Sequence, residues 1–162
     1  MIIIVMGVSG VGKTTIGTLL AQQLAVPFYD GDNFHSAANI AKMRQSLPLT
    51  DDDRALWLAA LGDFIQNLVN SQQSAVIACS ALKAAYRQQL GRGDSHIQFV
   101  YLKGDYDLIQ GRLNQRQGHF MAPTLLASQF ATLEEPEDSL VVDVAAPPQV
   151  VVQTICTHLG WA

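Results

Sequence analysis

The chain has 162 residues, 49% hydrophobic and 15% charged, and this length and composition predict a single globular domain over residues 1–162. Its formal net charge is −4, from 14 acidic and 10 basic side chains, whereas nucleic-acid-binding proteins usually have a basic excess, so we expect no nucleic-acid partner. No segment approaches the roughly 18 to 20 apolar residues of a membrane helix, and Cys79 and Cys156 are too few for a disulfide framework, so we expect a cytoplasmic protein without a membrane partner.

Short apolar runs predict the β-strands. The first run covers residues 2–6, and it is followed by glycines and then by a helix face formed by Ile16, Leu19, Leu20 and Leu24. A short strand is expected at 27–29. Continuous apolar runs, which are typical of strands covered on both faces, recur at 75–79, 97–102 and 140–144.

Helical patterns separate these runs. Thr50 is expected to cap a helix whose first turn carries three aspartates, which interact favourably with the helix dipole, and whose buried face is Leu58, Leu61, Ile65 and Leu68. Further helices are predicted at 84–90, 107–115, 125–133 and 150–159. Strands that alternate with helices predict an α/β fold of three layers with a parallel, five-stranded sheet.

A glycine-rich segment between the first strand and the first helix matches the phosphate-binding pattern G-x-x-x-x-G-K-[ST] at residues 7–14. Its glycines let backbone N–H groups turn toward phosphate oxygens, Lys13 can bridge the β- and γ-phosphates, and the Thr14 hydroxyl can bind Mg²⁺. A chance match is expected in roughly one chain of this length in a few hundred, even before the strand and helix are required. We therefore expect a bound nucleoside triphosphate, contacted by Gly7, Val8, Ser9, Gly10, Val11, Gly12, Lys13, Thr14 and Thr15.

Kinases, GTPases and motor-type ATPases share this loop, so other residues must distinguish them. No Asn-Lys-x-Asp guanine-reading motif occurs in the chain, which argues against a switch GTPase. Neither central strand ends in the Asp that many ATPases use to hold Mg²⁺. The candidate carboxylates are instead Asp30 and Asp32, which follow the strand at 27–29, where an open α/β sheet usually places ligand groups. The alternative is a polar Asp-Gly turn with solvated carboxylates.

The segment Asp30-Gly31-Asp32 resembles the shikimate kinase pattern, in which the first Asp supports the Mg²⁺ shell and the second receives the substrate hydroxyl. Over nearly the whole chain, the sequence is similar to the gluconate kinase family. The segments that carry this resemblance are, in order, 30–35, 39–43, 48–54, 57–58, 79–83, 86–87, 102–105, Arg112 with Arg116, 118–121, 128–130 and 133–134. Four positions depart from the family pattern without replacing a charged or phosphate-binding group: Val11, Ser36, Ser46 and Leu56.

The resemblance implies a nucleoside-monophosphate-kinase-like P-loop fold with a mobile lid at about residues 112–130. It also implies a homodimer that uses ATP and Mg²⁺ to phosphorylate D-gluconate at the 6-hydroxyl. The products, 6-phospho-D-gluconate and ADP, would feed the pentose phosphate or Entner-Doudoroff route. The implied Mg²⁺ ligands are Thr14 and Asp30. A kinase for another hydroxy acid, such as shikimate, and a nucleotide-binding module without catalysis remain as alternatives.

Phosphoryl transfer relies on positioning and positive charge, so the expected catalytic residues are Lys13, Asp32 and Arg116. Asp32 is expected to orient the 6-hydroxyl. Arg112 and Arg116, four positions apart, are expected to reach the phosphates from one helix face when the lid closes. The resemblance to related kinases also implies adenine contacts from Arg112 and from the region of Ala146 and Pro147. The alternative for both arginines is a basic helix end that interacts with the dipole.

Basic side chains are also expected at the acceptor. Arg54 and Arg87 are candidates for the gluconate carboxylate, because a guanidinium can form two parallel hydrogen bonds with it. Further candidate contacts to the sugar or phosphate are His35, Lys42, Lys83 and His119, of which His119 could equally be a packed lid residue. Taken singly, each of these residue types is more often solvated on the surface.

Overall fold

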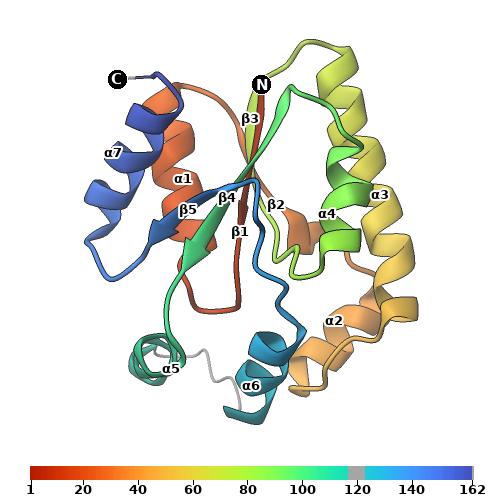
Figure 1. Cartoon of the computed structure of the whole chain (residues 1–162). Coiled ribbons are helices and arrows are strands. Elements are labelled where there is room, and N and C mark those ends of the chain that lie inside the picture. Colours follow the sequence, from red (N-terminus) through yellow and green to blue (C-terminus); the bar gives the residue numbers. More distant parts are fainter. Residues whose placement is uncertain (117–122, 162) are drawn as a thin grey trace.

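The computed structural model describes residues 1–116 and 123–161, and a parallel sheet forms its centre (Figure 1). The strands are β1 (Ile2–Met6), β2 (Phe28–Asp30), β3 (Ala75–Ala78), β4 (Ile97–Lys103) and β5 (Leu140–Asp143), in the spatial order β2-β3-β1-β4-β5. All neighbouring strands are parallel, and Ile4 of β1 lies opposite Ile77 of β3 and Phe99 of β4. The carboxyl ends of the strands therefore share one edge of the sheet.

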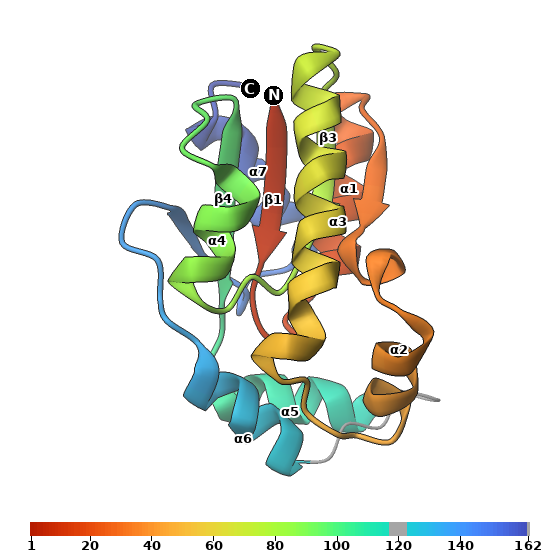
Figure 2. The same ribbon diagram turned by 90° about the vertical axis from the view of Figure 1, so that its right-hand side faces the viewer.

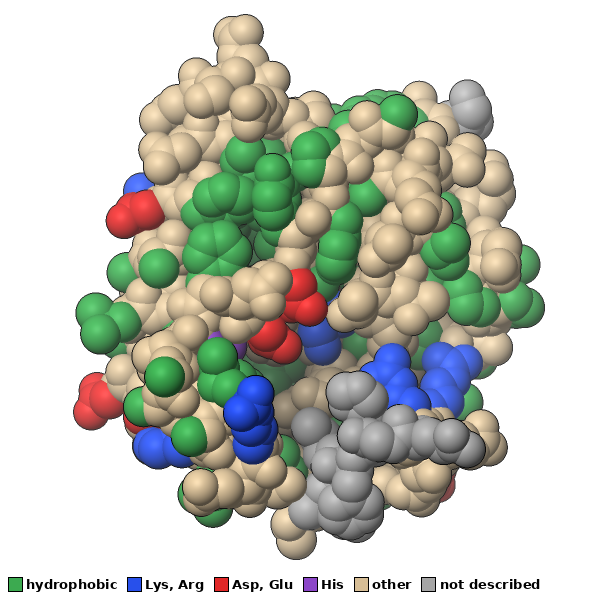
Figure 3. All heavy atoms as spheres, turned by 180° about the vertical axis from the view of Figure 1, so that it is seen from behind, with side chains coloured by type: hydrophobic (Ala, Val, Ile, Leu, Met, Phe, Trp, Pro, Cys, Tyr) green, Lys and Arg blue, Asp and Glu red, His purple; other side chains and the backbone are tan. Residues whose placement is uncertain are grey.

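Helices cover both faces of the sheet. On one face lie α1 (Lys13–Leu24) and α7 (Pro148–His158), and on the other lie α3 (Asp51–Asn70) and α4 (Ala84–Gly91) (Figures 1 and 2). Beyond the carboxyl ends of the strands lie α2 (Ala37–Arg44), α5 (Tyr106–Gln115), α6 (Pro123–Thr132) and a short 3₁₀ helix, η1 (Gly31–Phe34). Seen from the back, the surface near these elements is hollowed (Figure 3). None of the helices in the described ranges has the length and apolarity of a membrane span.

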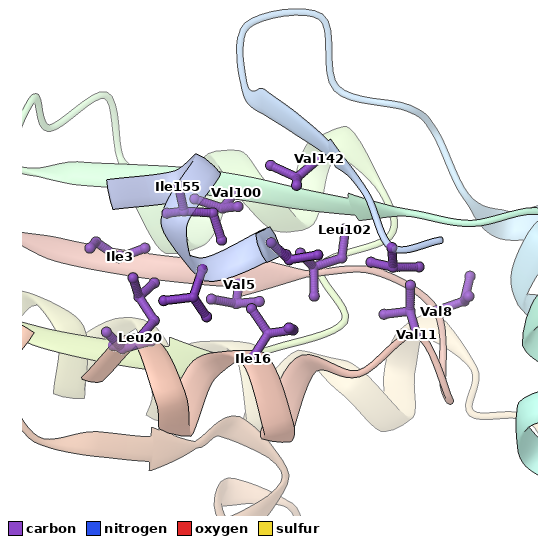
Figure 4. Close-up of a cluster of buried hydrophobic side chains, with 14 of the residues drawn as sticks. Ile3, Val5, Val8, Val11, Ile16, Leu20, Val100, Leu102, Val142 and Ile155 are labelled. Carbon is purple, nitrogen blue, oxygen red and sulfur yellow. The ribbon is translucent and has the colours of Figure 1, made fainter. Parts of the chain in front are cut away.

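The apolar core forms two layers, one on each face of the sheet. Every residue of β1 is at most 1% exposed. Ile3 and Val5 pack in the layer of α1 and α7 (Figure 4), whereas the layer of α3 and α4 contains Ile2, Ile4 and Met6. Because both faces are covered, the strand is apolar at every position and does not alternate with polar residues.

The predicted α/β fold is confirmed. Each predicted strand is present with bounds that differ by at most one residue, and the four helices predicted by range differ by at most two residues. The cap of α3 is also as expected: Thr50 Oγ1 accepts from the Asp53 N–H, and Asp53 Oδ2 accepts from the Thr50 N–H. These two hydrogen bonds give partners to two backbone N–H groups at the start of the helix.

Two elements were not predicted, η1 and α2. The α2 helix begins after Ser36, whose hydroxyl accepts from the Asn39 N–H at 3.1 Å. The one residue of α2 that is buried is the polar Asn39. Helices are recognised in a sequence by an apolar stripe, and α2 has none to detect.

Candidate active site

A cleft of about 500 Å³ opens at the carboxyl edge of the sheet, between the loop after β1, the end of β2 and helices α3, α5 and α6. Figure 3 shows acidic side chains beside a basic one in the hollow near the middle of the view. The predicted site residues that line the cleft are Ser9, Gly10, Gly12, Lys13, Thr14, Asp30, Asp32, His35, Arg54 and Arg116. The structure thus brings together residues that are more than 100 positions apart in the chain.

The glycine-rich loop joins β1 to α1 and has the backbone shape that an anion site needs. Gly10 and Gly12 have φ values of 82° and 106°, which side chains with a Cβ rarely adopt. Gly12 is also the N-cap of α1, and it has no side chain to accept the first N–H groups of the helix. These donors, together with the helix dipole, suit a phosphate group.

Lys13 lies inside this loop. Its Nζ donates to the carbonyl oxygens of Gly7 and Val8 at 3.0 and 2.9 Å. Burial lowers the pKa of the Lys13 ammonium, and the nearby carboxylates of Asp32 and Asp30 oppose this shift. The ammonium is therefore held beside the loop, in a place where negative charge stabilises it.

Asp30 and Asp32 stand at the end of β2. Asp30 pairs with Ala78 of β3, and its Oδ1 accepts from the Asp32 N–H at 2.9 Å, which fixes the turn into η1. Two thirds of the Asp32 side chain, 67%, is open to the cleft. Desolvation by the cleft walls raises the pKa of Asp32, and the Asp30 charge raises it further. Asp32 is thus a carboxylate with an increased affinity for a proton.

The oxygen donors near the loop are of the kind that Mg²⁺ binds. Thr14 supplies a hydroxyl and Asp30 a carboxylate to the same cleft. Across residues 1–116 and 123–161, no three His, Cys, Asp or Glu side chains gather as a metal-binding group. Mg²⁺ commonly uses one or two protein oxygens together with water and substrate phosphates, so this small donor set is sufficient for it.

The opposite wall of the cleft contains His35, Trp57 and Arg54. The His35 ring stacks on Trp57 with centroids 4.2 Å apart, and Trp57 Nε1 donates to the Gly31 carbonyl at 2.8 Å. Burial lowers the pKa of His35, which favours the neutral ring. Arg54 donates from Nη1 to the Tyr86 hydroxyl at 3.3 Å and lies over its ring, so the guanidinium is oriented while most of its N–H groups stay available.

Three predicted substrate contacts do not line the cleft. Lys42 Nζ lies 2.7 Å from Asp53 Oδ2, and Lys83 Nζ lies 2.9 Å from Asp51 Oδ1. Arg87 donates to the carbonyl oxygens of Ala81 and Glu134, both at 2.8 Å. Because these cations already have partners in the protein, they support the residues around the cleft and do not form part of its lining. A further predicted contact, His119, lies outside the described residues, as does part of the predicted lid.

Arg112 and Arg116 border a second hollow of about 280 Å³ on the other side of the loop. Arg112 Nη2 donates to the Val144 carbonyl at 2.6 Å. The predicted placement of both arginines on one helix face is wrong: α5 ends at Gln115, and Arg116 has extended backbone angles of −75° and 121°. Arg116 borders both hollows, as an extended residue at a helix end can.

Two of the remaining predicted nucleotide contacts, Gly7 and Val8, line neither hollow. Thr15 and Val11 line the second one. Pro147, the N-cap residue of α7, does not line it, but Ala146 of the same predicted region does, as does Pro148. The region where the base is expected, around Arg112 and Ala146, therefore lies at the second hollow, next to the loop.

Sequence reasoning missed several polar residues of the site: Ser80, Ser128, Gln129 and Thr132 line the cleft, and Asn39 contacts His35. Gln129 of α6 accepts from the Ser9 N–H at 2.7 Å and donates to Ser9 Oγ at 3.0 Å, which joins α6 to the loop. Asn39 Nδ2 lies 3.3 Å from Nδ1 of His35, which lines the cleft. Gln129 and Asn39 both lie in segments of the family resemblance, but a single amide on a helix gives no signal of its own.

Because the loop and the carboxylates line one cleft of about 500 Å³, the fold and the site are those of a phosphate-loop kinase that acts on small molecules. Residues 9–152 match the shikimate kinase family, and the thermoresistant gluconokinase of Escherichia coli (strain K12) is 45% identical over 155 residues, 93% of this chain and 89% of that protein. The chain belongs to the gluconokinase family.

Two solved structures agree with this assignment. An unliganded sugar kinase from Janibacter sp. HTCC2649 is 43% identical, with a TM-score of 0.91 over 99% of this chain and 95% of that one. A gluconokinase from Sinorhizobium meliloti 1021 is 41% identical, with a TM-score of 0.88 over 98% of this chain and 90% of that one. The similarity therefore extends over the whole fold.

Proposed function

We propose that the protein transfers the γ-phosphoryl group of ATP to the 6-hydroxyl of D-gluconate and gives 6-phospho-D-gluconate and ADP. The observation that carries this proposal is that Lys13 and Asp32 line the same cleft, so phosphates at the loop and a hydroxyl at Asp32 would meet. Membership of the gluconokinase family supports gluconate as the acceptor.

On the donor side, the backbone N–H groups of the loop, Lys13 and Arg116 bind the phosphates and stabilise the charge that spreads over the transferred group. Thr14 and Asp30 would hold Mg²⁺, which supplies further neutralisation of the phosphate charge when it is bound. Arg112, Ala146 and Pro148 face the base in the second hollow.

On the acceptor side, Asp32 accepts the hydrogen of the 6-hydroxyl. The hydroxyl oxygen then forms a bond to the γ-phosphorus while the bond from that phosphorus to the bridging oxygen of ADP breaks, and the proton remains on Asp32. The raised pKa of Asp32 suits this role. Arg54 binds the carboxylate of gluconate through the N–H groups that its contact with Tyr86 leaves available.

The test is an ADP-release assay of the purified protein with gluconate, shikimate and glycerate, and the product is identified by ³¹P NMR. We expect turnover with gluconate and little with the other two acids. The match to the shikimate kinase family makes shikimate the second candidate, and faster turnover with shikimate would replace our proposal. Binding of ATP without turnover on any acceptor would instead indicate a non-catalytic nucleotide-binding module.

We further propose that residues 1–162 form one domain, as their length indicates, that the protein is cytoplasmic, as its few cysteines indicate, and, from the family resemblance, that it is a homodimer. Light scattering after size-exclusion chromatography measures the oligomeric state, because the monomer has a mass of 17.6 kDa. A mass of one chain at micromolar concentration would contradict the dimer.

A further inference from the structure

Asn39 is unusual in this fold because it is a polar side chain in the interior. It is 5% exposed, and within residues 1–116 and 123–161 no other amide or charged residue is buried to this degree. A buried amide is stable only when its hydrogen-bonding groups have partners. The partners of Asn39 therefore indicate what the residue does.

The orientation of the Asn39 amide follows from its contact with Asp53. One end of the amide lies 2.6 Å from the Asp53 backbone carbonyl oxygen. A carbonyl oxygen can only accept, so the group facing it must be the Nδ2 amide nitrogen and not the oxygen. The backbone at the start of α3 thus fixes the amide.

The same nitrogen then determines the tautomer of His35. Asn39 Nδ2 lies 3.3 Å from His35 Nδ1, and an amide nitrogen has hydrogens to donate but no lone pair to accept with. His35 Nδ1 must therefore accept, so the proton of the neutral ring is on Nε2. Stacking on Trp57 and a side-chain exposure of 3% hold the ring in this orientation.

The protonated nitrogen faces the cleft beside Asp32. His35 Nε2 lies 3.7 Å from Asp32 Oδ1, which is too long for a hydrogen bond between them. A donor and an acceptor at this separation can instead each bind one of two neighbouring oxygens. Burial and Arg54 keep the ring neutral, against the opposite effects of Asp32 and Asp30.

We propose that Asn39 is a positioning residue that fixes His35 as a neutral Nε2 donor, and that this donor and Asp32 together recognise two adjacent hydroxyl groups of the acceptor. The reacting hydroxyl donates to Asp32, and the oxygen of its neighbour accepts from His35 Nε2. This assignment rests on the proposed function for the identity of the acceptor. The tautomer of His35 follows from the Asn39 contacts alone and does not depend on the proposed function.

The tautomer is measured by NMR of the unliganded protein labelled with ¹⁵N at histidine, with His35→Gln used to assign the His35 signals. We expect a pyrrole-like Nε2 and a pyridine-like Nδ1 at neutral pH. Asn39→Asp replaces the donor by an acceptor and should move the proton to Nδ1. A parent protein with the proton on Nδ1, or on both nitrogens, overturns the proposal even if Asn39→Asp does not fold.

Recognition of the second hydroxyl is measured by comparing kcat/KM for D-gluconate and 5-deoxy-D-gluconate. The parent should prefer gluconate by about 3- to 10-fold, the range of one neutral hydrogen bond. His35→Gln keeps a neutral donor and should keep this preference, whereas His35→Met should abolish it. A full preference in His35→Met overturns the proposed contact. Failure of the parent to phosphorylate gluconate would overturn the proposed function and leave the NMR result standing.

Discussion

Replacing Gly31 by alanine would force a methyl group against the backbone of the neighbouring strand. A Cβ at this position would lie 2.6 Å from the Ala78 carbonyl oxygen, 3.3 Å from Leu61 Cδ2 and 3.4 Å from Cys79 Cβ. Ala78 belongs to β3, which is hydrogen-bonded to β1 on one side and to β2 on the other. The obstacle therefore cannot rotate away as a flexible side chain would.

The size of the effect follows from this rigidity. Adding a methyl group to a packed interior typically lowers the free energy of unfolding by about 1–3 kcal/mol. Because the obstacle here is backbone, we expect Gly31→Ala to lie in the upper part of this range, at about 2–3 kcal/mol. For a domain of this size, that loss lowers Tm by roughly 4–12 °C. Because Gly31 separates Asp30 from Asp32, the displaced turn also moves both carboxylates, and a shift near 1 Å can reduce kcat by about 100-fold.

Gly111→Ala is the matched control. Gly111 lies within α5, and a Cβ there would meet nothing within 4 Å, so alanine should stabilise the helix by about 0.5–1 kcal/mol. Both variants are measured by urea unfolding and by kcat with gluconate. A Gly31→Ala protein with the unfolding midpoint and kcat of the parent would refute the steric argument, and an equally damaged Gly111→Ala protein would show that any added methyl group is harmful.

The other predictions concern the site and its supporting wall. Asp32→Asn should lower kcat by about 10²- to 10⁴-fold with unchanged ATP affinity in calorimetry, and near-normal turnover would remove Asp32 from the mechanism. Arg116→Ala should lower kcat much more than it raises KM for ATP, because its charge acts on the transferred group, and an unchanged kcat would contradict this role. Asp53 has its pKa lowered to about 2, first by Lys42 and then by the Thr50 N–H, so the stability it supplies is present above about pH 4 and is lost as the pH falls toward about 2. In urea unfolding at about pH 6 and pH 3, Asp53→Asn should therefore lose less stability than the parent, and an equal loss would show that Asp53 does not titrate as described.

The sheet could be predicted from the sequence because its signals are local. Strands with two covered faces appear as unbroken apolar runs, and the 2–6 run is the buried strand β1. The loop at 7–14 was equally clear, since its glycines and Lys13 lie within one short segment of the chain. The predicted helix at 107–115 also ends where α5 ends, at Gln115, but Arg116 was still assigned to a helix face, because nothing in the residues around it marks the change from helical to extended backbone.

The roles of individual cations could not be predicted in this way. Lys42 and Lys83 have the charge expected of substrate contacts, but they bind Asp53 and Asp51. Those aspartates were expected to act only on the start of α3. Whether a lysine meets a ligand or a nearby carboxylate depends on how distant segments pack, which residue types and spacing do not record.

The order of the strands separates the two reactants along the sheet. The residues that we propose for the acceptor side, Asp30, Asp32, His35 and Arg54, follow β2, which lies on one side of β1. Arg112 and Pro148, which we propose for the nucleotide base, follow β4 and β5 on the other side. Substitutions within residues 30–57 can therefore alter the proposed acceptor site in evolution without changing any residue that borders the second hollow.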